Sequence, residues 1–437
     1  MHRTLWAALL PILLLPAACT PPSLLRTEVS ELRKRTDPLL LISIDGFRPD
    51  YLDRGLTPTL ARLAHEGVRA ESMQPAFPSL TYPNHYTLVT GLTPDHHGIV
   101  NNTMDDPEIP GRFSPSNRNA VTDARWWNEA TPIWISADRA GLRTATMFWP
   151  GSEAPIHGMH PDYWKPFDAA VTPTQRVDQV LAWLDLPADA RPRFLTLYFD
   201  GVDHQAHEHG PDSIEVNAAL ATVDEALARL LAGLNRQGIE HHINLVIVSD
   251  HGMAATPPQQ LLKLDDLVNE DAIDVLTLGA LAGLHARPGH EHEVAAALLK
   301  PQLHMECWAK DAVPPRLRYG HNPRVPALVC LANVGWQITT RHALAHRLGT
   351  HLGDHGYDNA APEMRALFVA NGPAFVCGAV LKPFPNIDVY PMLAHLLHIQ
   401  PLPNDGDVAP LRPALRDTAP RSDAARCPAS AIRPESP

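Results

Sequence analysis

The sequence lacks an excess of positive charge. Its 36 Lys and Arg residues are outnumbered by 48 Asp and Glu residues, which gives a formal net charge of −12. A protein that holds nucleic acid through its phosphates needs a basic surface, so the composition argues against a nucleic-acid-binding platform. An acidic enzyme that acts on anionic substrates instead needs local cations, and bound metal ions would supply them.

The sequence also lacks an N-terminal apolar run that is long enough to span a bilayer. The run at residues 5–15 is well short of the roughly 20 residues that a transmembrane helix needs. Because basic residues precede it and small residues follow it, we predict a signal peptide at residues 1–18 and an exported, periplasmic protein. Cys19 would then be available for a lipid anchor. Pro16 stands where bacterial lipoprotein signals usually carry an aliphatic residue, so lipidation of Cys19 stays open.

Cysteine is scarce, with five residues in 437. Cys307, Cys330, Cys377 and Cys427 remain beyond the predicted signal and Cys19. An even number in an exported protein suggests two disulfides, for which three pairings exist. A Cys307–Cys330 bond would close a local loop, and a Cys377–Cys427 bond would pin the C-terminal segment. Four buried thiols are the alternative, and the sequence does not decide.

Three short, continuous apolar runs are each followed by acidic residues: 39–44, 194–199 and 244–249. Such runs fit central strands of a parallel sheet that is covered on both faces. Helical patterns lie between them. This alternation predicts a doubly wound, mostly parallel α/β domain over residues 38–409, after a linker or short helix at 19–37. The predicted helices are 57–66, 131–140, 174–184 and 213–237.

Residues 265–345 interrupt this regularity, and we predict that they form a small inserted α+β subdomain. The main domain then resumes with a strand and a helix. Residues 410–437 are rich in Pro, Ala, Arg and Ser and are predicted to form a disordered tail. The predicted elements are strands at 273–278, 327–331, 335–339 and 366–370 and helices at 290–299 and 388–397.

Carboxylates follow all three strand-like runs, where ligands bind in doubly wound folds. Each Asp alone could simply cap the next helix. Three of them, at positions 45, 203 and 250, favour a metal site instead. Asp45, Asp250 and His251 can converge with Thr81 on one cation, as a plausible tetrahedral zinc set.

A second cation site has two candidate ligand pairs, because two Asp-x-x-x-His pairs overlap between residues 200 and 207. The pairs Asp200–His204 and Asp203–His207 both place two ligands within reach of one ion, and composition does not choose between them. His355, which lies between glycines, would complete that site and leave one position open. Two zinc ions about 4 Å apart would clamp the attacking and leaving oxygens of an in-line phosphoryl displacement.

Thr81 is the candidate nucleophile. It stands just before an apolar-periodic run, and Pro83 falls in the expected first helical turn. This arrangement predicts Thr81 as a helix N-cap, with its hydroxyl at the positive end of the helix. That end favours a bound anion and a hydroxyl that gives up its proton. A plain capping role is the alternative.

Several longer motifs resemble bacterial members of the nucleotide pyrophosphatase/phosphodiesterase family of the alkaline phosphatase superfamily. The resemblance runs from about residue 39 to about residue 403, and it implies an alkaline-phosphatase-like fold. In the family pattern the metal-binding Asp and His lie shortly ahead of a Gly-Pro, with the His three residues before that Gly. Gly210 and Pro211 match, so the resemblance selects Asp203 and His207. The motifs are SIDGFRPDYL, FPSLTYPNHYTLVTGLTPDHHGIVNNTMDDP, FWPGSE, VDHQAHEHGPDS, SDHGM and GDHGYDN.

The resemblance also implies the roles of the site residues. Thr81 would form a phosphothreonine intermediate and release a nucleoside 5′-monophosphate, and Asn102 would donate a hydrogen bond to a phosphoryl oxygen. A turn role for Asn102 is the alternative. Two Zn²⁺ ions would be held by two ligand sets. The first set is Asp45, Thr81, Asp250 and His251, and the second is Asp203, His207 and His355.

Tyr82 and Phe167 match family positions where aromatic rings flank the base, and Trp149 lies in the same loop wall; core packing is the alternative for these rings.

The implied substrates are nucleoside triphosphates, dinucleotides or other nucleotide phosphodiesters. The segment between Trp149 and Phe167 is complete, whereas the lysophospholipid-cleaving branch of the family shortens it. Three alternatives stay open: a lysophospholipid or choline phosphodiesterase, a phosphomonoesterase of the superfamily, and a non-catalytic zinc-binding protein.

Overall fold

The structure is a computed structural model that describes residues 22–346 and 351–416. The predicted signal peptide, Cys19, Cys427 and the tail beyond residue 416 lie outside the described residues. Within the described residues, every helix is too short or too polar to cross a membrane. Helix α1 (Pro22–Arg35) occupies most of the segment that we predicted as a linker or short helix.

The main sheet has eight strands in the order β19-β2-β18-β9-β1-β8-β6-β7. At its centre β1 pairs in parallel with both β8 and β9, while β18 is antiparallel to its neighbours. The sheet is therefore mostly parallel, as predicted, and two predicted strand ranges coincide with β1 and β8. The strands are β1 (Leu39–Ile44), β2 (Val68–Ala70), β6 (Thr144–Met147), β7 (Tyr163–Lys165), β8 (Phe194–Phe199), β9 (Asn244–Val248), β18 (Phe368–Asn371) and β19 (Ala379–Leu381).

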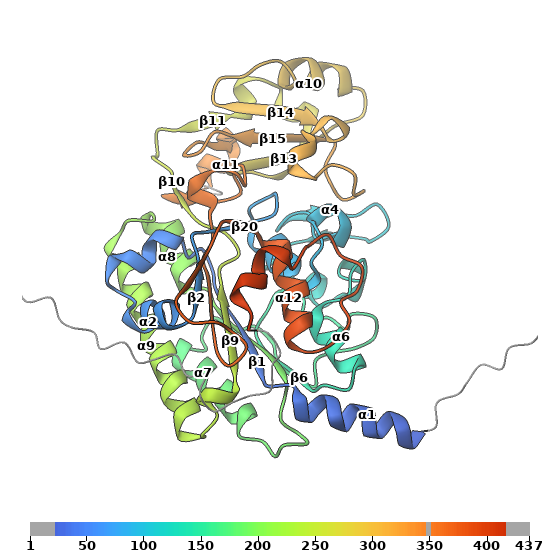
Figure 1. The fold of residues 1–437 in the computed structure, drawn as a ribbon. Coiled ribbons are helices and arrows are strands. Elements are labelled where there is room, and N and C mark those ends of the chain that lie inside the picture. Colours follow the sequence, from blue (N-terminus) through green and yellow to red (C-terminus); the bar gives the residue numbers. More distant parts are fainter. Residues whose placement is uncertain (1–21, 347–350, 417–437) are drawn as a thin grey trace, which may run out of the picture.

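Helices cover both faces of this sheet (Figure 1). Side chains of β1 alternate between two cores, because Leu39 and Leu41 pack in one cluster and Leu40 and Ile42 in the other. This two-sided burial explains why the strand is apolar at every position. One layer holds α2 (Pro58–Glu66), α7 (Pro173–Leu184), α8 (Gly201–His209) and α9 (Ile214–Arg236). The other holds α3 (Thr81–Thr90), α4 (Pro94–His97), α5 (Arg118–Val121), α6 (Ile133–Arg139) and α12 (Val389–Leu396).

Residues between β9 and β18 form a smaller lobe with its own four-stranded antiparallel sheet, ordered β12-β13-β15-β14, and its own apolar core. Cys307 and Cys330 face each other on β14 and β15 and form a disulfide. The predicted strand at 335–339 pairs with β11 instead of joining the four-stranded sheet. The lobe contains β11 (Leu261–Lys263), β12 (Ile273–Thr277), β13 (Leu281–Ala286), α10 (Glu291–Leu298), β14 (Met305–Ala309), β15 (Leu328–Ala332), β16 (Gln337–Thr339) and α11 (Arg341–Ala345).

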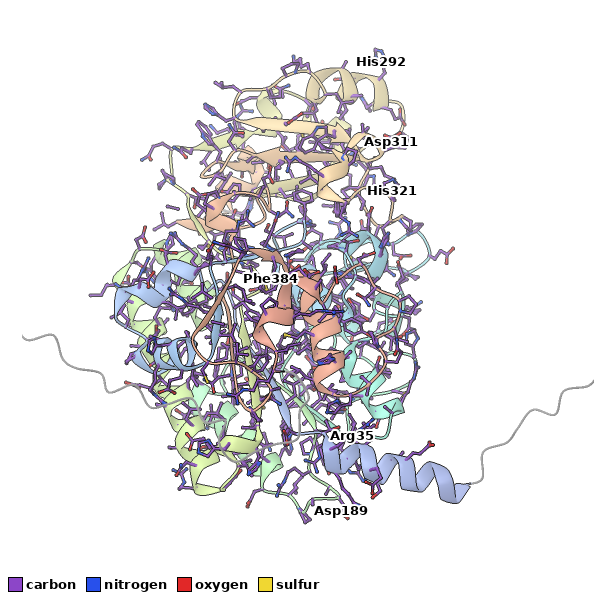
Figure 2. The ribbon with its side chains drawn as sticks, viewed as in Figure 1. Arg35, Asp189, His292, Asp311, His321 and Phe384 are labelled. Atoms are coloured by element: carbon purple, nitrogen blue, oxygen red, sulfur yellow. A yellow bond between two sulfur atoms is a disulfide. The ribbon has the colours of Figure 1, made fainter. Side chains whose placement is uncertain are left out.

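Several contacts fix the lobe against the main domain, at its neck and farther out. At its neck, β10 (Ala254–Ala255) pairs with β17 (Gly353–Asp354), which brings both ends of the insertion together. Farther out, the carboxylate of Asp95 accepts backbone N–H bonds from Gly320, His321 and Asn322. Figure 2 labels His321 at the edge of the lobe that faces the main domain. Short two-stranded ladders join β3 (Met73–Gln74) to β20 (Phe384–Pro385) and β4 (Met104–Asp105) to β5 (Arg112–Phe113).

His97, at the end of α4, is a fully buried imidazole. Its Nδ1 accepts the N–H of Ile99 at 3.1 Å, and its Nε2 lies 3.0 Å from Thr87 Oγ1. Burial lowers the pKa of His97 to about 3. Because this pKa is lower in the folded chain than in the unfolded chain, the stability that His97 contributes is complete above about pH 6.5. It is lost progressively as the pH falls toward 3.

We therefore expect His97→Gln to flatten the acid side of the stability profile. The difference in free energy of unfolding between wild type and variant should shrink as the pH falls from 7 to 4. Unfolding of the wild type exposes the imidazole of His97, which then takes up a proton at low pH, and the variant has no such group. Urea denaturation at several pH values measures this difference. His241→Gln, at an exposed histidine, is the control. A difference that stays constant with pH for His97→Gln would contradict the assignment.

Candidate metal centre and active site

Seven predicted site residues converge at the carboxyl edge of the main sheet. Asp45 directly follows β1, Asp250 and His251 follow β9, and α8 begins two residues after β8. Ligand atoms of Asp203, His207 and His355 lie within 4.8 Å of one another, as do those of Asp45, Asp203 and His251. Thr81 Oγ1 lies 3.2 Å from His251 Nε2, which brings the candidate nucleophile to the same cluster.

Three histidines of this cluster are held in the same way. The Nδ1 atom of each lies 2.8–2.9 Å from a backbone carbonyl oxygen: Gly353 for His207, Gly252 for His251 and Ser79 for His355. A carbonyl oxygen can only accept, so each Nδ1 carries a proton. With Nδ1 fixed as the donor, Nε2 is the ring atom that is directed at the cluster, as in metal-binding histidines.

The Nε2 atoms of these rings face carboxylates. His251 Nε2 lies 3.0 Å from Asp250 Oδ2 and 3.4 Å from Asp45 Oδ1, while His207 Nε2 lies 3.4 Å from Asp203 Oδ2. His355 Nε2 lies 3.6 Å from the other oxygen of Asp203. These nitrogen and oxygen atoms lie close enough to one another to bind a cation jointly. The donor set of nitrogen and oxygen atoms is one that zinc accepts.

Buried carboxylate oxygens in the cluster lack hydrogen-bond partners. Within the described residues, Asp45 Oδ1, Asp203 Oδ1 and Asp250 Oδ2 are buried and accept no hydrogen bond. An unpartnered buried anion is strongly destabilising, so these oxygens indicate sites for cations. Burial, with repulsion from Asp250 and Asp203, raises the pKa of Asp45 well above its ordinary value. Burial alone would also raise the pKa of Asp250, but charges on His251 and His85 overcome it and hold that pKa well below its usual range.

The structure separates the two overlapping Asp-x-x-x-His pairs. Asp203 and His207, one turn apart on α8, point into the cluster. Asp200 instead forms an ion pair with Arg176 at 2.6 Å, and His204 is exposed, with Glu208 as its acidic neighbour at 3.8 Å. The glycine at position 46 lets the backbone after β1 lie close to Asp203, because a Cβ there would be 3.0 Å from Asp203 Oδ1. The backbone of Gly46 also has φ +66°, a conformation that favours glycine.

Thr81 is the first residue of α3 and not its N-cap, which corrects one prediction. Leu80 is the N-cap, with extended backbone angles, and its side chain makes no capping bond. Asn102 takes over that capping role, because its Oδ1 accepts the backbone N–H of Tyr82 at 2.9 Å. The Thr81 hydroxyl is therefore not used to cap the helix and lies beside His251.

His85, one helical turn after Thr81, is a buried site residue that the sequence analysis missed. Its Nδ1 lies 2.9 Å from the carbonyl oxygen of Thr81 and 3.3 Å from Asp250 Oδ2, and its Nε2 lies 2.9 Å from Ser43 Oγ. Both ring nitrogens are thus engaged, so His85 supports Asp250 and the first turn of α3 instead of presenting a free lone pair. In the sequence, His85 could have been found from its spacing of four residues from Thr81, which places both side chains on the same face of a helix.

The three aromatic residues predicted near the substrate differ in placement. Tyr82 is partly buried, with its ring 5.6 Å edge-on from Phe113. Phe167 is 40% exposed and packs 6.2 Å from Tyr198, whose hydroxyl donates to Asp45 Oδ2. Trp149 is 3% exposed, and its indole N–H donates to the carbonyl of His85. The structure therefore places Trp149 in the core behind α3 and not in an open pocket wall.

Comparisons with known proteins agree with this geometry. Residues 39–358 match the family model described as type I phosphodiesterase/nucleotide pyrophosphatase. An uncharacterized pyrophosphatase/phosphodiesterase of Schizosaccharomyces pombe is 38% identical over 379 residues, which cover 84% of this chain and 78% of that protein. Human ectonucleotide pyrophosphatase/phosphodiesterase family member 5 is 34% identical over 385 residues, which cover 88% and 79%. The match to bovine member 3, at 36% identity, covers 84% of this chain but 43% of that longer protein.

Solved structures show the same fold. Murine ectonucleotide pyrophosphatase/phosphodiesterase 5 superposes with a TM-score of 0.83 at 34% identity, over 87% of this chain and all of that chain. A second structure of that murine protein is an inactive threonine-to-alanine variant in complex with AMP. The alkaline-phosphatase-like α/β fold that we predicted is thereby confirmed.

We expect His207→Asn to weaken the binding of a divalent metal ion by roughly 10-fold or more, because it removes one ligand nitrogen. Calorimetric titration of the metal-free protein with Zn²⁺ measures this loss. His204→Asn is the matched control, since it makes the same change on the same helix at an exposed position, and its affinity should equal that of the wild type. Equal losses in the two variants would contradict the selection of Asp203 and His207.

Proposed function

The chain belongs to the type I phosphodiesterase/nucleotide pyrophosphatase family and is a hydrolase of phosphodiester bonds, and we propose that it is a zinc-dependent nucleotide pyrophosphatase/phosphodiesterase. In this proposal it releases nucleoside 5′-monophosphates through a phosphothreonine intermediate at Thr81. One observation carries the proposal: three histidines, each with Nδ1 fixed by a backbone carbonyl, turn Nε2 toward three crowded carboxylates next to a threonine hydroxyl.

Two Zn²⁺ ions fit the residues present. The first set is Asp45, Thr81, Asp250 and His251, and the second is Asp203, His207 and His355. The unpartnered oxygens of the three aspartates support bound cations, and the grouping of Asp203, His207 and His355 supports the second set. When bound, such ions neutralise the crowded carboxylates, lower the pKa of a nearby hydroxyl and stabilise charge on phosphoryl oxygens.

The chain's own residues supply a nucleophile and its orientation. The Thr81 hydroxyl gives up its proton to water, the bond from Oγ to phosphorus forms, and the bond from phosphorus to the leaving oxygen breaks, with the electron pair on that oxygen. Water then hydrolyses the phosphothreonine, which returns the hydroxyl and frees the nucleoside monophosphate. The N-terminus of α3 lies under this centre and favours negative charge there. Because the Oδ1 of Asn102 is engaged by the Tyr82 N–H, its Nδ2 is left to donate to a phosphoryl oxygen.

The nucleoside would stack between Tyr82 and Phe167. The partial exposure of Phe167 supports this placement, and its neighbour Tyr198 links it to Asp45. Base–aromatic stacking of this kind is worth about 1–3 kcal/mol per base and tolerates different bases. Trp149 supports the site indirectly in this proposal, by holding the backbone of His85.

The proposed substrate class and cellular location are based on the relatives of the chain. AMP is bound in a solved relative, and two other relatives, from human and Xenopus laevis, are bis(5′-adenosyl)-triphosphatases at 35% and 34% identity. We therefore propose nucleoside triphosphates, dinucleotides and other nucleotide diesters as substrates. Relatives described as ectonucleotide enzymes support export, and the periplasm would be the compartment if the source is bacterial. A bacterial source stays a prediction, and a lipid anchor at Cys19 is not part of the proposal.

A panel of three substrates tests the reaction class. We expect the p-nitrophenyl ester of a nucleoside 5′-monophosphate to be hydrolysed with a kcat/KM roughly 10-fold or more above those of p-nitrophenyl phosphate and lysophosphatidylcholine. The reason is that the site would bind the nucleoside and accept a transferred group with one fewer negative charge than a monoester. Release of nitrophenol or choline measures the rates. Faster turnover of the monoester, or of the lipid, would select one of the alternative functions.

Thr81→Ala tests the nucleophile. We expect kcat to fall by roughly 10³-fold or more, because no other side chain can form the covalent intermediate. Bound metal, measured by elemental analysis, should remain in the variant through the Asp and His ligands. Thr81→Ser keeps a hydroxyl and should retain part of the activity. Full activity in Thr81→Ala would rule out the phosphothreonine route.

A further inference from the structure

Phe167, the proposed stacking ring, lies in an exposed segment of the chain. Residues 166–170 follow β7, and each of them is exposed. A ring in such a segment is mobile unless other elements hold it. The ring centre of Phe167 lies 5.2 Å from that of Phe148, 6.2 Å from that of Tyr198 and 5.8 Å from the Cζ atom of Arg176. These contacts therefore decide where the ring lies.

Arg176 is a cation that the fold buries almost completely. It lies near the start of α7, and its exposed fraction is 2%. Burial of a guanidinium is costly unless its charge and its N–H groups are paired. Its Nη1 donates to Asp200 Oδ1 at 2.6 Å and to the carbonyl oxygen of Tyr198 at 2.9 Å. Its Nε donates to the carbonyl oxygen of Val171 at 2.9 Å. The side chain thus joins the end of the exposed segment to the end of β8.

The same guanidinium lies over two aromatic rings. Its Cζ is 5.0 Å from the ring centre of Phe148 and 5.8 Å from that of Phe167. A planar, weakly hydrated guanidinium stacks on such rings, and this attraction offsets part of the cost of its burial. The bond to the Val171 carbonyl holds the backbone of the exposed segment, and the ring contact holds the side chain of Phe167.

The core of α7 does not require a charge at position 176. A buried ion pair is often no more stabilising than apolar residues of similar volume, so stability alone does not account for Arg176 and Asp200. The aromatic ring that the pair holds gives it a role. The other buried residues of α7 are all apolar: Val177, Val180, Leu181, Trp183 and Leu184.

We propose that Arg176 is a positioning residue for nucleoside binding, which holds Phe167 where the base stacks. The inference rests on the proposed function, because it needs a nucleoside at Phe167. Tyr198 connects this contact to the metal cluster, since its carbonyl accepts from Arg176 and its hydroxyl donates to Asp45 Oδ2 at 2.6 Å. A substrate with its phosphate at the cluster and its base on Phe167 needs this spacing to be fixed.

Two substrates with the same leaving group isolate the contribution of the base. The p-nitrophenyl ester of a nucleoside 5′-monophosphate and methyl p-nitrophenyl phosphate are both singly charged diesters. One carries a nucleoside where the other carries a methyl group. The ratio of their kcat/KM values therefore reports on nucleoside binding, and it does not depend on how much of a variant is folded.

Arg176→Lys keeps a positive charge beside Asp200 but loses the planar group and its fork of donors. We expect it to lower the ratio by roughly 5-fold or more, which corresponds to a weakened base stack. The change should appear in the KM of the nucleoside ester and not in its kcat, as for a contact that is equal in the ground state and the transition state. A merely structural role would lower the rates on both substrates alike.

Arg229→Lys is the matched control. Arg229 also forms an ion pair with an aspartate, Asp178 on α7, at 2.6 Å, but both side chains of this pair are largely exposed. The same substitution there should leave the ratio equal to that of the wild type. A similar fall in both variants would overturn the inference.

A double-mutant cycle tests whether Arg176 acts through the ring. Phe167→Ala alone should lower the ratio by roughly 10-fold. Added to Phe167→Ala, Arg176→Lys should cause no further fall. An equal fall in both backgrounds, no fall in either, or a ratio unchanged by Phe167→Ala would overturn the positioning role while the hydrolytic function stands. If the wild type does not hydrolyse the nucleoside ester, the proposed function itself is overturned, and this inference with it.

Discussion

Electrostatic crowding at the carboxyl edge of the main sheet is the constraint on which the rest of the site depends. Asp45, Asp203 and Asp250 bring three carboxylates into a largely buried volume, and each keeps one oxygen without a hydrogen bond among the described residues. Such a cluster is unstable unless positive charge balances it. The histidines direct Nε2 at these carboxylates, because their Nδ1 atoms donate to backbone carbonyls, and Nε2 is the atom that a metal ion would use. The arrangement is therefore prepared for cations.

The architecture builds this cluster from distant parts of the chain. The central strands β1, β8 and β9 end side by side, so the residues that follow them meet at one edge. The remaining ligand, His355, arrives from the far end of the inserted lobe. The β10–β17 pair begins shortly after His251 and ends directly before His355, which explains why the two rings stack at 3.5 Å. Helix α3 then brings Thr81 in from the opposite layer, and the side chain of Asn102 fixes its first turn.

Much of the fold and most of the site residues could be predicted from the sequence, and the elements that could not have physical causes. Fully buried parallel strands read as unbroken apolar runs, so β1 and β8 were predicted to the residue. Strand β13 was missed because its sequence, LAGLHA, contains a glycine and no β-branched residue. Thr81 was taken for an N-cap because the capping partner, Asn102, lies 21 residues away and enters only through tertiary structure. The choice between the Asp200 and Asp203 pairs rested on the family pattern. The sequence alone does not show that Arg176 forms an ion pair with Asp200 and so removes it from the cluster.

The neck of the inserted lobe has a consequence for how the family can diversify. Because β10 and β17 are paired, residues 256–352 leave and re-enter the main domain at one point, and the ladder that orients His355 belongs to the neck. The outer part of the lobe can therefore change in length without displacing the ligands, provided that this ladder and the contacts of residues 320–322 with Asp95 are kept. The surroundings of the reaction centre can thus vary between relatives, or be varied by a protein engineer, while the centre itself is inherited unchanged.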